Sequence, residues 1–442
     1  MKTKKMQRDL KIRRVLGLAR PRVVSSVAGV LMAFGLMGGA HAEPMKTIKI
    51  AIIDPFSGPF GPVGTLNAQI IESVIQRVNA AKDLGNYQLQ LVPFDDKLNP
   101  SIALVDAQKA ADEGIRYIMQ GNGSNVSFAL IDWLQKHNRM NPQNKMLYFN
   151  YAAADPGLSN EDCGFYHFNF AANANMQMAA LVSYIAEQKN IKKIFLINMD
   201  YSAGHSFADT AEIMLKKELP DVKIVGDVFT PIGQTKDYTP FIYKIKESGA
   251  QAVITSNWGP DMSLLAKAAG QNGLKNVPIF SFYGGVPGTP QAIGDDGAGV
   301  VMQLSAWVST VGGEEETYAE AFRKQYHNDW YYGEQVFMIG MLAKAIREAG
   351  TDDPTQVALH LEGMHYASPT GDVYMRADNN SAVMPLYFSV LEKGSPSLKG
   401  TDLHWQVVKR VPAIRLMLPT SCKMDRPAGA VLPNAYYGTT GQ

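Results

Sequence analysis

Apolar and polar positions along the chain follow two periods in turn. Short apolar runs, typical of buried strands, precede longer segments with apolar residues every three to four positions, typical of helices. The first pair is the run 48–53, which ends in the Gly- and Pro-rich loop 57–64, and the helical pattern 66–81. A strand, a loop and a helix in this order form the repeating unit of a doubly wound parallel sheet. The pattern therefore predicts an α/β fold.

The same alternation continues along the first third of the chain. Each further apolar run is short enough for a strand, and each is followed by a polar loop. The expected strands are 88–94, 117–120 and 146–150, and the expected helices are 101–113 and 127–137. Together with the first pair, these elements predict one β/α lobe with a parallel sheet.

A second alternation begins near residue 168 and predicts a second lobe. Its expected helices are 176–188, 205–218, 238–248 and 262–272, and its expected strands are 193–199, 223–229, 252–256 and 278–282. The helical patterns 315–326 and 334–349 indicate a return to the first lobe, and the segment 368–374 indicates a further crossing.

We therefore expect two doubly wound, Rossmann-like lobes joined by a hinge, with the site in the cleft between them. The expected bounds are 43–167 plus about 300–370 for the first lobe, and 168–299 plus about 371–442 for the second.

The first 42 residues have the pattern of an export signal. Residues 1–22 carry nine Lys or Arg and one acid, and the uncharged stretch that follows ends in Ala40-His41-Ala42, a small-x-small cleavage signal. A membrane anchor is the alternative, because the stretch is long enough to span a bilayer, although four glycines interrupt it. We expect a cleaved signal peptide and a periplasmic protein.

Removing this segment changes the charge of the chain. It takes away nine of 42 basic residues and one of 41 acidic residues, so the net charge moves from +1 to −7. An acidic protein has no electrostatic reason to bind nucleic acid or anionic lipid. Two cysteines remain, Cys163 and Cys422. In an oxidising compartment they can form a disulfide, and the sequence leaves open whether they meet.

The segment 236–253, followed by 258–262, closely resembles the periplasmic branched-chain amino-acid-binding proteins of ABC importers. The motifs at 57–59, 94–96 and 371–373 agree with this family in order and spacing. The resemblance covers nearly all of residues 46–395. It implies the type I periplasmic binding fold, a small organic ligand, an ABC permease as partner, a monomer and no cofactor. Where studied members of the family have a disulfide, this chain has Leu98 and Gly123, so both cysteines are absent together.

Carboxylate capture is expected at the loop that leads into the helix near residue 127. Backbone N–H groups at a helix start favour an anion, and the Ser124 hydroxyl adds a donor. The resemblance matches Ser124, beside Asn125, to the serine that holds the ligand carboxylate; the alternative is that Ser124 only caps the helix. Ala152 and Ala154 fall where the family supplies a second contact, and Ala154 lacks the hydroxyl.

Aromatic side chains are expected to close over the ligand. Trp258 matches a family tyrosine that lines the pocket, with core packing as its alternative role. Tyr201 or its neighbour Ala203 matches another tyrosine, and spacing favours Ala203. On the first loop, Phe60 and Val63 are expected to contact the ligand.

Tyr283 stands where the amino-acid binders carry the acid that pairs with the ligand ammonium. A buried ammonium without a charge partner is costly. Unless Asp54, Asp200 or Asp261 substitutes for that acid, a carboxylate-bearing ligand without an amine, or a neutral amide, is favoured over a standard α-amino acid.

Enzyme motifs are weak in this sequence. Gly204-His205-Ser206-Phe207-Ala208 resembles a nucleophile elbow, but four residues separate it from the preceding strand. The loop at 121–126 is a broken dinucleotide fingerprint, and the His and Cys spacings match no metal motif. We therefore expect no catalytic residue, no metal and a solute-binding protein of an ABC importer. A ligand sensor that signals to a receptor or regulator is the alternative, and an exported hydrolase comes third.

Overall fold

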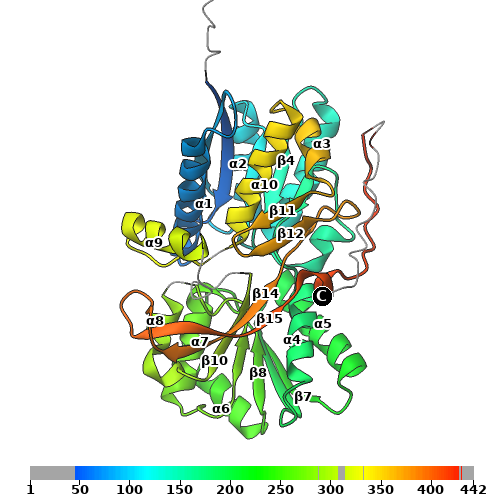
Figure 1. Ribbon diagram of the computed structural model, residues 1–442. Helices are drawn as coiled ribbons and strands as arrows, with labels where there is room; N and C mark the ends of the chain where they lie inside the picture. The colour runs from blue at the N-terminus through cyan, green and yellow to red at the C-terminus, as the bar shows by residue number, and fades with distance from the viewer. Residues whose placement is uncertain (1–44, 287, 307–313, 332, 428–429, 431–442) are drawn as a thin grey trace, which may run out of the picture. The chain divides into compact units, whose positions relative to one another are not determined.

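The computed structural model describes residues 45–286, 288–306, 314–331, 333–427 and 430 (Figure 1). The expected signal peptide, residues 1–42, lies outside this part of the chain. The described residues form three sheets, of five, seven and three strands. The first two sheets, with helices packed on them, give the doubly wound α/β fold that the sequence predicts.

The first sheet is parallel throughout and has the strand order β2-β1-β3-β4-β5. Helices cover both of its faces, which is why β1 is apolar and buried without a break from Ile50 to Ile53. Ile50 and Ile52 pack with α1 and α10 on one face, whereas Ala51 and Ile53 pack with α2 and α3 on the other. The elements are β1 Lys46–Asp54, α1 Gly61–Ala81, β2 Tyr87–Asp95, α2 Pro100–Asp112, β3 Tyr117–Gln120, α3 Ser124–Met140, β4 Leu147–Asn150, the 3₁₀ turn η1 Pro156–Ser159, β5 His167–Asn169, α10 Glu334–Ala349 and α11 Pro354–Leu361.

The second sheet has the order β15-β14-β10-β9-β8-β6-β7. Strands β6 to β10 are parallel, and β14 and β15 extend the sheet in antiparallel fashion. Its elements are α4 Ala174–Ile185, β6 Lys193–Met199, α5 Ser202–Glu218, β7 Lys223–Thr230, α6 Thr239–Glu247, β8 Ala252–Thr255, α7 Gly259–Gln271, β9 Ile279–Ser281, α8 Thr289–Ile293, the turn η2 Gly294–Gly297, β10 Val301–Ser305, β14 Leu386–Lys393 and β15 Leu403–Val411.

Several helices begin earlier than the apolar pattern indicates. Helix α1 begins at Gly61 rather than 66, and α5 begins at Ser202 rather than 205. In both, a glycine in the first turn lets the helix lie directly on the end of the preceding strand. A Cβ at Gly64 would collide with the carbonyl oxygen of Pro55, and a Cβ at Gly204 with that of Met199. The glycines that look like loop residues in the sequence therefore belong to helices.

The segment 368–374 does not cross between the two large sheets, and this prediction is wrong. It is the turn of a hairpin between β11 His365–Ser368 and β12 Gly371–Met375, which form the third sheet with β13 Ala382–Val383. Gly371 has φ +118°, a conformation that the tight turn needs and that side chains disfavour. The chain reaches the second sheet only after β13, where β14 begins.

Sheet membership also bears on the expected lobe bounds. Strand β5 pairs with the first sheet and β10 with the second. An isolated bridge joins Asn169, the last residue of β5, to Ser381, which precedes β13. The bounds 43–167 plus about 300–370, and 168–299 plus about 371–442, remain a prediction; these pairings favour moving them by several residues.

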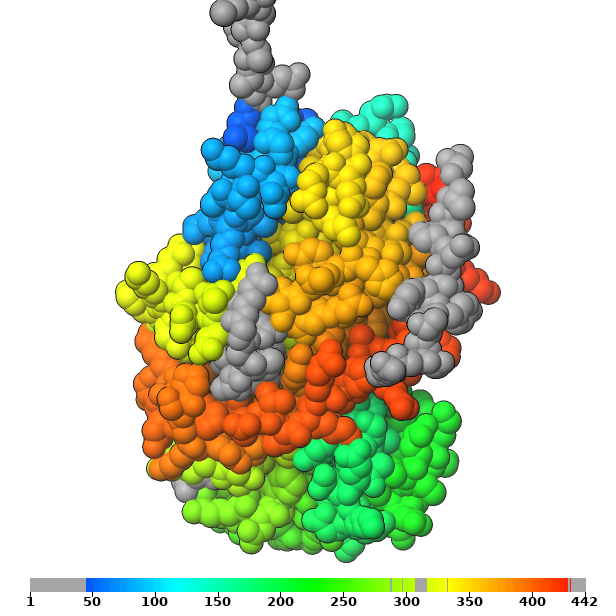
Figure 2. Space-filling model, viewed as in Figure 1, coloured from blue at the N-terminus to red at the C-terminus, as the bar shows by residue number. Residues whose placement is uncertain are grey.

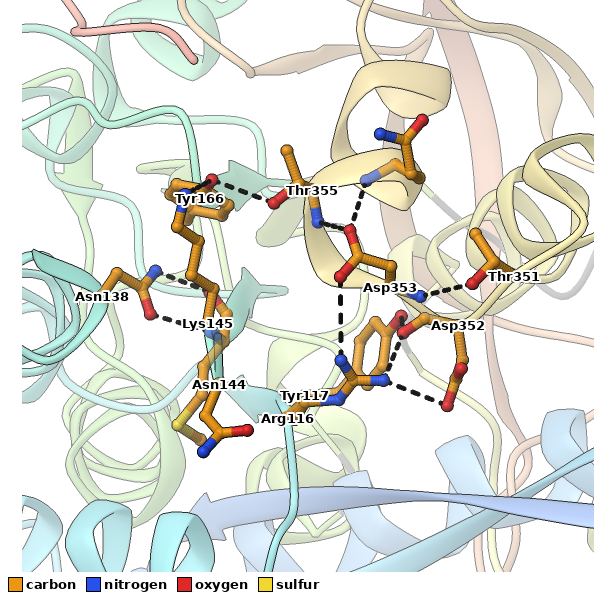
Figure 3. Close-up of polar contacts among 12 residues, drawn as sticks. Arg116, Tyr117, Asn138, Asn144, Lys145, Tyr166, Thr351, Asp352, Asp353 and Thr355 are labelled. Atoms are coloured by element: carbon orange, nitrogen blue, oxygen red, sulfur yellow. Dashed lines mark hydrogen bonds and ion pairs between the residues drawn. The ribbon is translucent and has the colours of Figure 1, made fainter. Parts of the chain in front are cut away.

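The connection between α10 and α11 is fixed to the amino ends of the first sheet (Figure 3). The carbonyl oxygen of Asp352 accepts hydrogen bonds from the Tyr117 hydroxyl at 2.8 Å and the Arg116 guanidinium at 3.0 Å. The Asp352 carboxylate forms an ion pair with the Lys46 ammonium at 2.8 Å. The hydroxyls of Tyr166 and Thr355 share a hydrogen bond at 3.1 Å. Helix α9 Glu314–Tyr326 comes before α10 in the chain. These contacts fix the segment between α10 and α11 to the first sheet, which agrees with the predicted return of the pattern 334–349 to the first lobe.

The chain after β15 runs back to the first sheet. The turn η3 Ala413–Leu416 packs against α4 and β13. Beyond it, Cys422 forms a disulfide with Cys163 in the loop before β5, so the two cysteines that the sequence left open are paired. The Arg426 guanidinium donates to the buried Glu362 at 2.8 Å. In Figure 2 the orange part of the chain, which holds β14 and β15, forms a continuous band across the face in view.

Candidate functional site

Strand order identifies two edges where a small molecule can bind. In the first sheet β1 lies between β2 and β3, and in the second β6 lies between β7 and β8. The connections therefore leave in opposite directions between β1 and β3, and again between β6 and β8. Doubly wound sheets bind ligands at such switch points, beyond the carboxyl ends of the strands.

Four helices start at these switch points, and none has a side-chain N-cap. The N-cap positions of α1, α3, α5 and α7 are Phe60, Gly123, Tyr201 and Trp258, and none makes a side-chain cap bond. Helices α2, α4 and α11 are capped by Asn99, Asn173 and Asp353, whereas α6 and α10 also lack a side-chain cap. A missing cap costs a helix about 1 kcal/mol. Because α6 and α10 lack a cap as well, the four helix starts are distinguished by their place at the switch points.

The loop before α3 has the geometry expected for binding an anion. Gly123 has φ +85°, and Leu98 lies over it, with its Cδ1 2.8 Å from where a Cβ of Gly123 would stand. Leu98 and Gly123, which stand where studied members of the family have a disulfide, are therefore packed against each other. Ser124 is the first residue of α3 and is buried, and its Oγ accepts a hydrogen bond from the Asp155 backbone N–H at 3.3 Å.

The loop after β4 lies beside Ser124 through this Asp155 contact. It carries both predicted alanines: Ala154 is buried, and its carbonyl oxygen accepts from Ala174 N–H at 2.8 Å. Ala152 is half-buried, and its N–H donates to the Asn150 side chain at 3.2 Å.

Asp54 anchors the loop before α3 from below. Its fully buried carboxylate accepts from the Gly121 N–H at 3.4 Å, and from the Asn122 N–H at 3.3 Å and side chain at 2.9 Å. The Asn67 amide at 3.3 Å and the Tyr151 hydroxyl complete the set. Burial raises the pKa of Asp54 to about 6, although these hydrogen bonds lower it. The Asp54 carboxylate is therefore already hydrogen-bonded to groups at the edge of the first sheet.

Neighbouring Asp96 is also largely buried. Burial, together with the nearby Asp54 charge, raises its pKa to about 8. Its Oδ1 accepts from the Leu98 N–H at 2.8 Å, so the same pair of acids supports both sides of the Leu98–Gly123 contact.

An aromatic contact joins the two switch points. The rings of Phe60 and Trp258 lie 4.5 Å apart with a 44° tilt, and both side chains are buried. The indole N–H of Trp258 donates to the Tyr201 hydroxyl at 3.2 Å. Val63 lies close to the start of α7, because a Cβ at Gly259 would be 3.6 Å from its Cγ2. Four predicted residues thus meet, whereas Ala203 is buried within α5.

A polar contact joins the same two regions through Asn125, which the sequence analysis selected, and through Asp155 and Ser202, which it did not select as site residues. The Asn125 side-chain oxygen accepts from the Ser202 N–H at 3.4 Å. The buried Asp155 carboxylate accepts from the hydroxyls of Ser202 and Ser206, the latter at 3.0 Å. Two features of the sequence could have indicated this contact. Asp155 directly follows the loop that carries Ala152 and Ala154, and the first turn of α5 contains no acid.

The remaining predicted residues lie elsewhere. The Tyr283 ring meets Phe207 edge-on at 6.5 Å, and its N–H donates to the Ser281 hydroxyl at 3.1 Å. Asp200 is exposed and pairs with His205 at 2.8 Å. Asp261 is buried and accepts from the Tyr238 hydroxyl at 2.8 Å and Gly233 N–H at 2.9 Å. Each of the three aspartates considered as an ammonium partner is therefore already engaged.

Metal-binding clusters and membrane-spanning helices are both absent from the described ranges. No cluster of three or more His, Cys, Asp or Glu side chains there is placed to hold a metal ion. Among the same residues, no helix combines the length and apolar character needed to cross a bilayer.

Solved structures share this fold. A leucine-, isoleucine-, valine-, threonine- and alanine-binding protein from Brucella ovis, in a closed conformation, superimposes with a TM-score of 0.79 at 25% identity, covering 87% of this chain and all of that one. A solute-binding protein of an ABC transporter from Rhodopseudomonas palustris HaA2, in complex with p-hydroxybenzoic acid, gives a TM-score of 0.72 at 21% identity, covering 83% and 98%. The second likeness shows the fold alone.

Sequence comparison agrees with the structural result. A Leu/Ile/Val-binding protein homolog 4 from Brucella melitensis is 27% identical over 90% of this chain and 98% of its own length. The leucine-, isoleucine-, valine-, threonine- and alanine-binding protein of Pseudomonas aeruginosa is 24% identical over 76% and 87%. Residues 47–396 match the family described as periplasmic binding proteins. The chain belongs to the periplasmic binding protein family.

Proposed function

We propose that this protein is the solute-binding component of an ABC importer and captures a small organic ligand between its two lobes by hinge closure. The observation that carries the proposal is the convergence of four helix starts without side-chain caps. Three of their N-cap positions hold the aromatic residues Phe60, Tyr201 and Trp258, and the fourth precedes Ser124. The protein would act in the periplasm as a monomer and present its closed form to a permease.

The ligand carboxylate would bind at the start of α3. The helix dipole and outward-pointing N–H groups favour an anion there, and the Ser124 hydroxyl supplies a further donor. Helix α3 has neither a side-chain cap nor an acid in its first turn. Asn125, Ala152 and Ala154 would border this end of the ligand, and Phe60, Val63, Tyr201 and Trp258 would enclose its body.

The charges around this place favour a ligand without an ammonium group. Tyr283 replaces the expected acid, and Asp54, Asp200 and Asp261 are occupied by other partners. An aromatic acid, a short carboxylate or a neutral amide is therefore the proposed ligand class. The complex of the R. palustris protein with p-hydroxybenzoic acid supports an aromatic acid as one member of that class.

A thermal-shift screen tests the ligand class, because a ligand that binds only the folded protein raises its melting temperature. The panel contains amino acids, aromatic acids, amides and short carboxylates. We expect stabilisation by carboxylates without an amine. Tight leucine binding that persists after individual replacement of the three aspartates would contradict the ligand class while leaving solute binding intact.

Ser124→Ala tests the carboxylate site with the best compound of the screen. Loss of a hydrogen bond to a charged group should weaken binding about 10- to 100-fold in calorimetry. Ser101→Ala, at an exposed position in α2, is the matched control and should bind normally. Equal affinity of both variants would remove Ser124 from the site.

A further inference from the structure

We propose that Asp155 is a positioning residue that latches the start of α5 to the ligand loops of the first sheet. The inference rests on the proposed function, because those loops are the ones assigned to ligand capture. It adds a residue that neither the resemblance nor the aromatic pattern selected.

The two carboxylate oxygens of Asp155 have separate partners. Oδ1 accepts from the Gly157 N–H at 2.9 Å, which caps the short turn η1 in the same loop. Oδ2 accepts from the hydroxyls of Ser202 and Ser206, which belong to the first turns of α5. Asp155 is 8% exposed, so the contact is largely shielded from water. One oxygen therefore stabilises the local loop, and the other reaches the second sheet's helix.

Helix α5 lacks its own means of stabilising its start. Its N-cap, Tyr201, makes no side-chain cap bond, and its first turn contains no acid. The first N–H groups of a helix and its positive dipole end call for an acceptor or a negative charge. Asp155 supplies that charge from a distant loop. When the lobes separate, α5 loses it, so lobe approach and helix stability are coupled.

The latch is continuous with the proposed carboxylate site. The Asp155 N–H donates to Ser124 Oγ at 3.3 Å, and Asn125 accepts from the Ser202 N–H at 3.4 Å. The same two residues at the start of α3 thus contact Asp155 and α5. A ligand held at Ser124 would fix the backbone that positions the Asp155 carboxylate, and this links capture to closure.

Asp155→Ser separates the two roles. Serine is a good N-cap and keeps the local turn η1, but its side chain is too short to reach α5. The double variant Ser202→Ala/Ser206→Ala removes the same contacts from the other side. Asn173→Ala is the control that removes a helix cap without touching α5. Asn173 accepts from the Met176 N–H at 3.0 Å and donates to the Ser159 hydroxyl of η1 at 3.3 Å.

Hydrogen exchange measured without added ligand gives the first readout. We expect exchange at residues 202–206 to rise about fivefold to tenfold in Asp155→Ser and in the double serine variant, with η1 and α4 unchanged. Combining the variants should add little, because both remove one interaction. Asn173→Ala should raise exchange at the start of α4 and in η1 and leave residues 202–206 unchanged. Unchanged exchange at 202–206 in Asp155→Ser would overturn the latch.

Binding kinetics give the second readout, with L-leucine and 4-hydroxybenzoate as probes. For a probe that binds the wild-type protein, Asp155→Ser should raise the dissociation rate about 10-fold or more and change the association rate little, because the latch acts after lobe approach. An unchanged dissociation rate would contradict the link to capture. If neither probe binds the wild type, the exchange experiment alone decides the latch.

Discussion

Helices α3 and α5 begin in the same local way but satisfy their first turns differently. Both follow a parallel strand at a switch point, and both lack a side-chain N-cap and an acid in the first turn. The loop before α3 is held by Asp54, a buried acid in the same lobe. The start of α5 receives its acid, Asp155, from the loop after β4.

The difference shows how one sequence feature can serve two purposes. At α3 the acid lies beneath the loop, which leaves the outward face of the helix start for the proposed ligand. At α5 the acid occupies the helix start itself and joins the two lobes. A helix without its own cap is therefore a place where either a ligand or another part of the chain supplies the missing acceptor.

Replacing Asp54 and Asp155 one at a time should give the largest difference in the free energy of unfolding between the two helix starts. Asp54→Ala leaves several buried donors without an acceptor and should lower the free energy of unfolding by about 3–5 kcal/mol. Asp155→Ala should cost about 1–2 kcal/mol, because two of its partners are hydroxyls that water can reach once the contact opens. Urea titrations of both variants measure the difference. Equal losses would mean that both acids have the same structural role.

The two buried acids near the start of α3, Asp54 and Asp96, should make the free energy of unfolding depend on pH. Burial raises the folded-state pKa of Asp96 from 3.8 to about 8 and that of Asp54 to about 6. The folded protein therefore holds protons that the unfolded chain releases above its own pKa. Stability from this source is complete below about pH 4 and is lost as the pH rises to about 8.

Between pH 6 and pH 8 the expected loss in the free energy of unfolding is about 2 kcal/mol. Asp96→Asn should flatten this slope in urea titrations at several pH values. A slope that persists in the variant would assign the dependence to other groups.

The strained start of α3 should tolerate substitution less well than an ordinary turn. Gly123→Ala places a Cβ at φ +85° and against Leu98, and should cost about 1–2 kcal/mol in thermal unfolding. Gly85→Ala is the matched control, with φ +63° and no atom within 4 Å of the new Cβ. A similar cost for both would mean that the Leu98 contact contributes nothing.

The smallest effect is expected at the aromatic contact beside α5. Trp258→Phe keeps the ring against Phe60 and removes the N–H that donates to the Tyr201 hydroxyl at 3.2 Å. We expect a loss of about 1 kcal/mol in chemical unfolding, and the same loss for Tyr201→Phe. The double variant should lose no more than either single one, and full additivity would show that the two groups act independently.

The site could be predicted in part because its residue types are unusual where they stand. Phe60, Val63, Ser124 and Trp258 were selected from strand-end positions and a family resemblance, and the structure brings three of them together with Tyr201 or Asp155. Asp155 was missed because its partners, Ser202 and Ser206, are about fifty residues away in the chain. Tyr283 was selected by alignment alone, and its ring packs on Phe207.

The sequence by itself determined the α/β alternation, most helix and strand positions and the family. These properties depend on local periodicity, on turn residues and on short motifs, which act over a few neighbours in the chain. Only the tertiary structure decided where the chain crosses between sheets, that Cys163 and Cys422 pair, and which acids are already bonded. Those outcomes depend on contacts between distant segments, and no local pattern encodes the partner that a buried carboxylate or a free helix start will find.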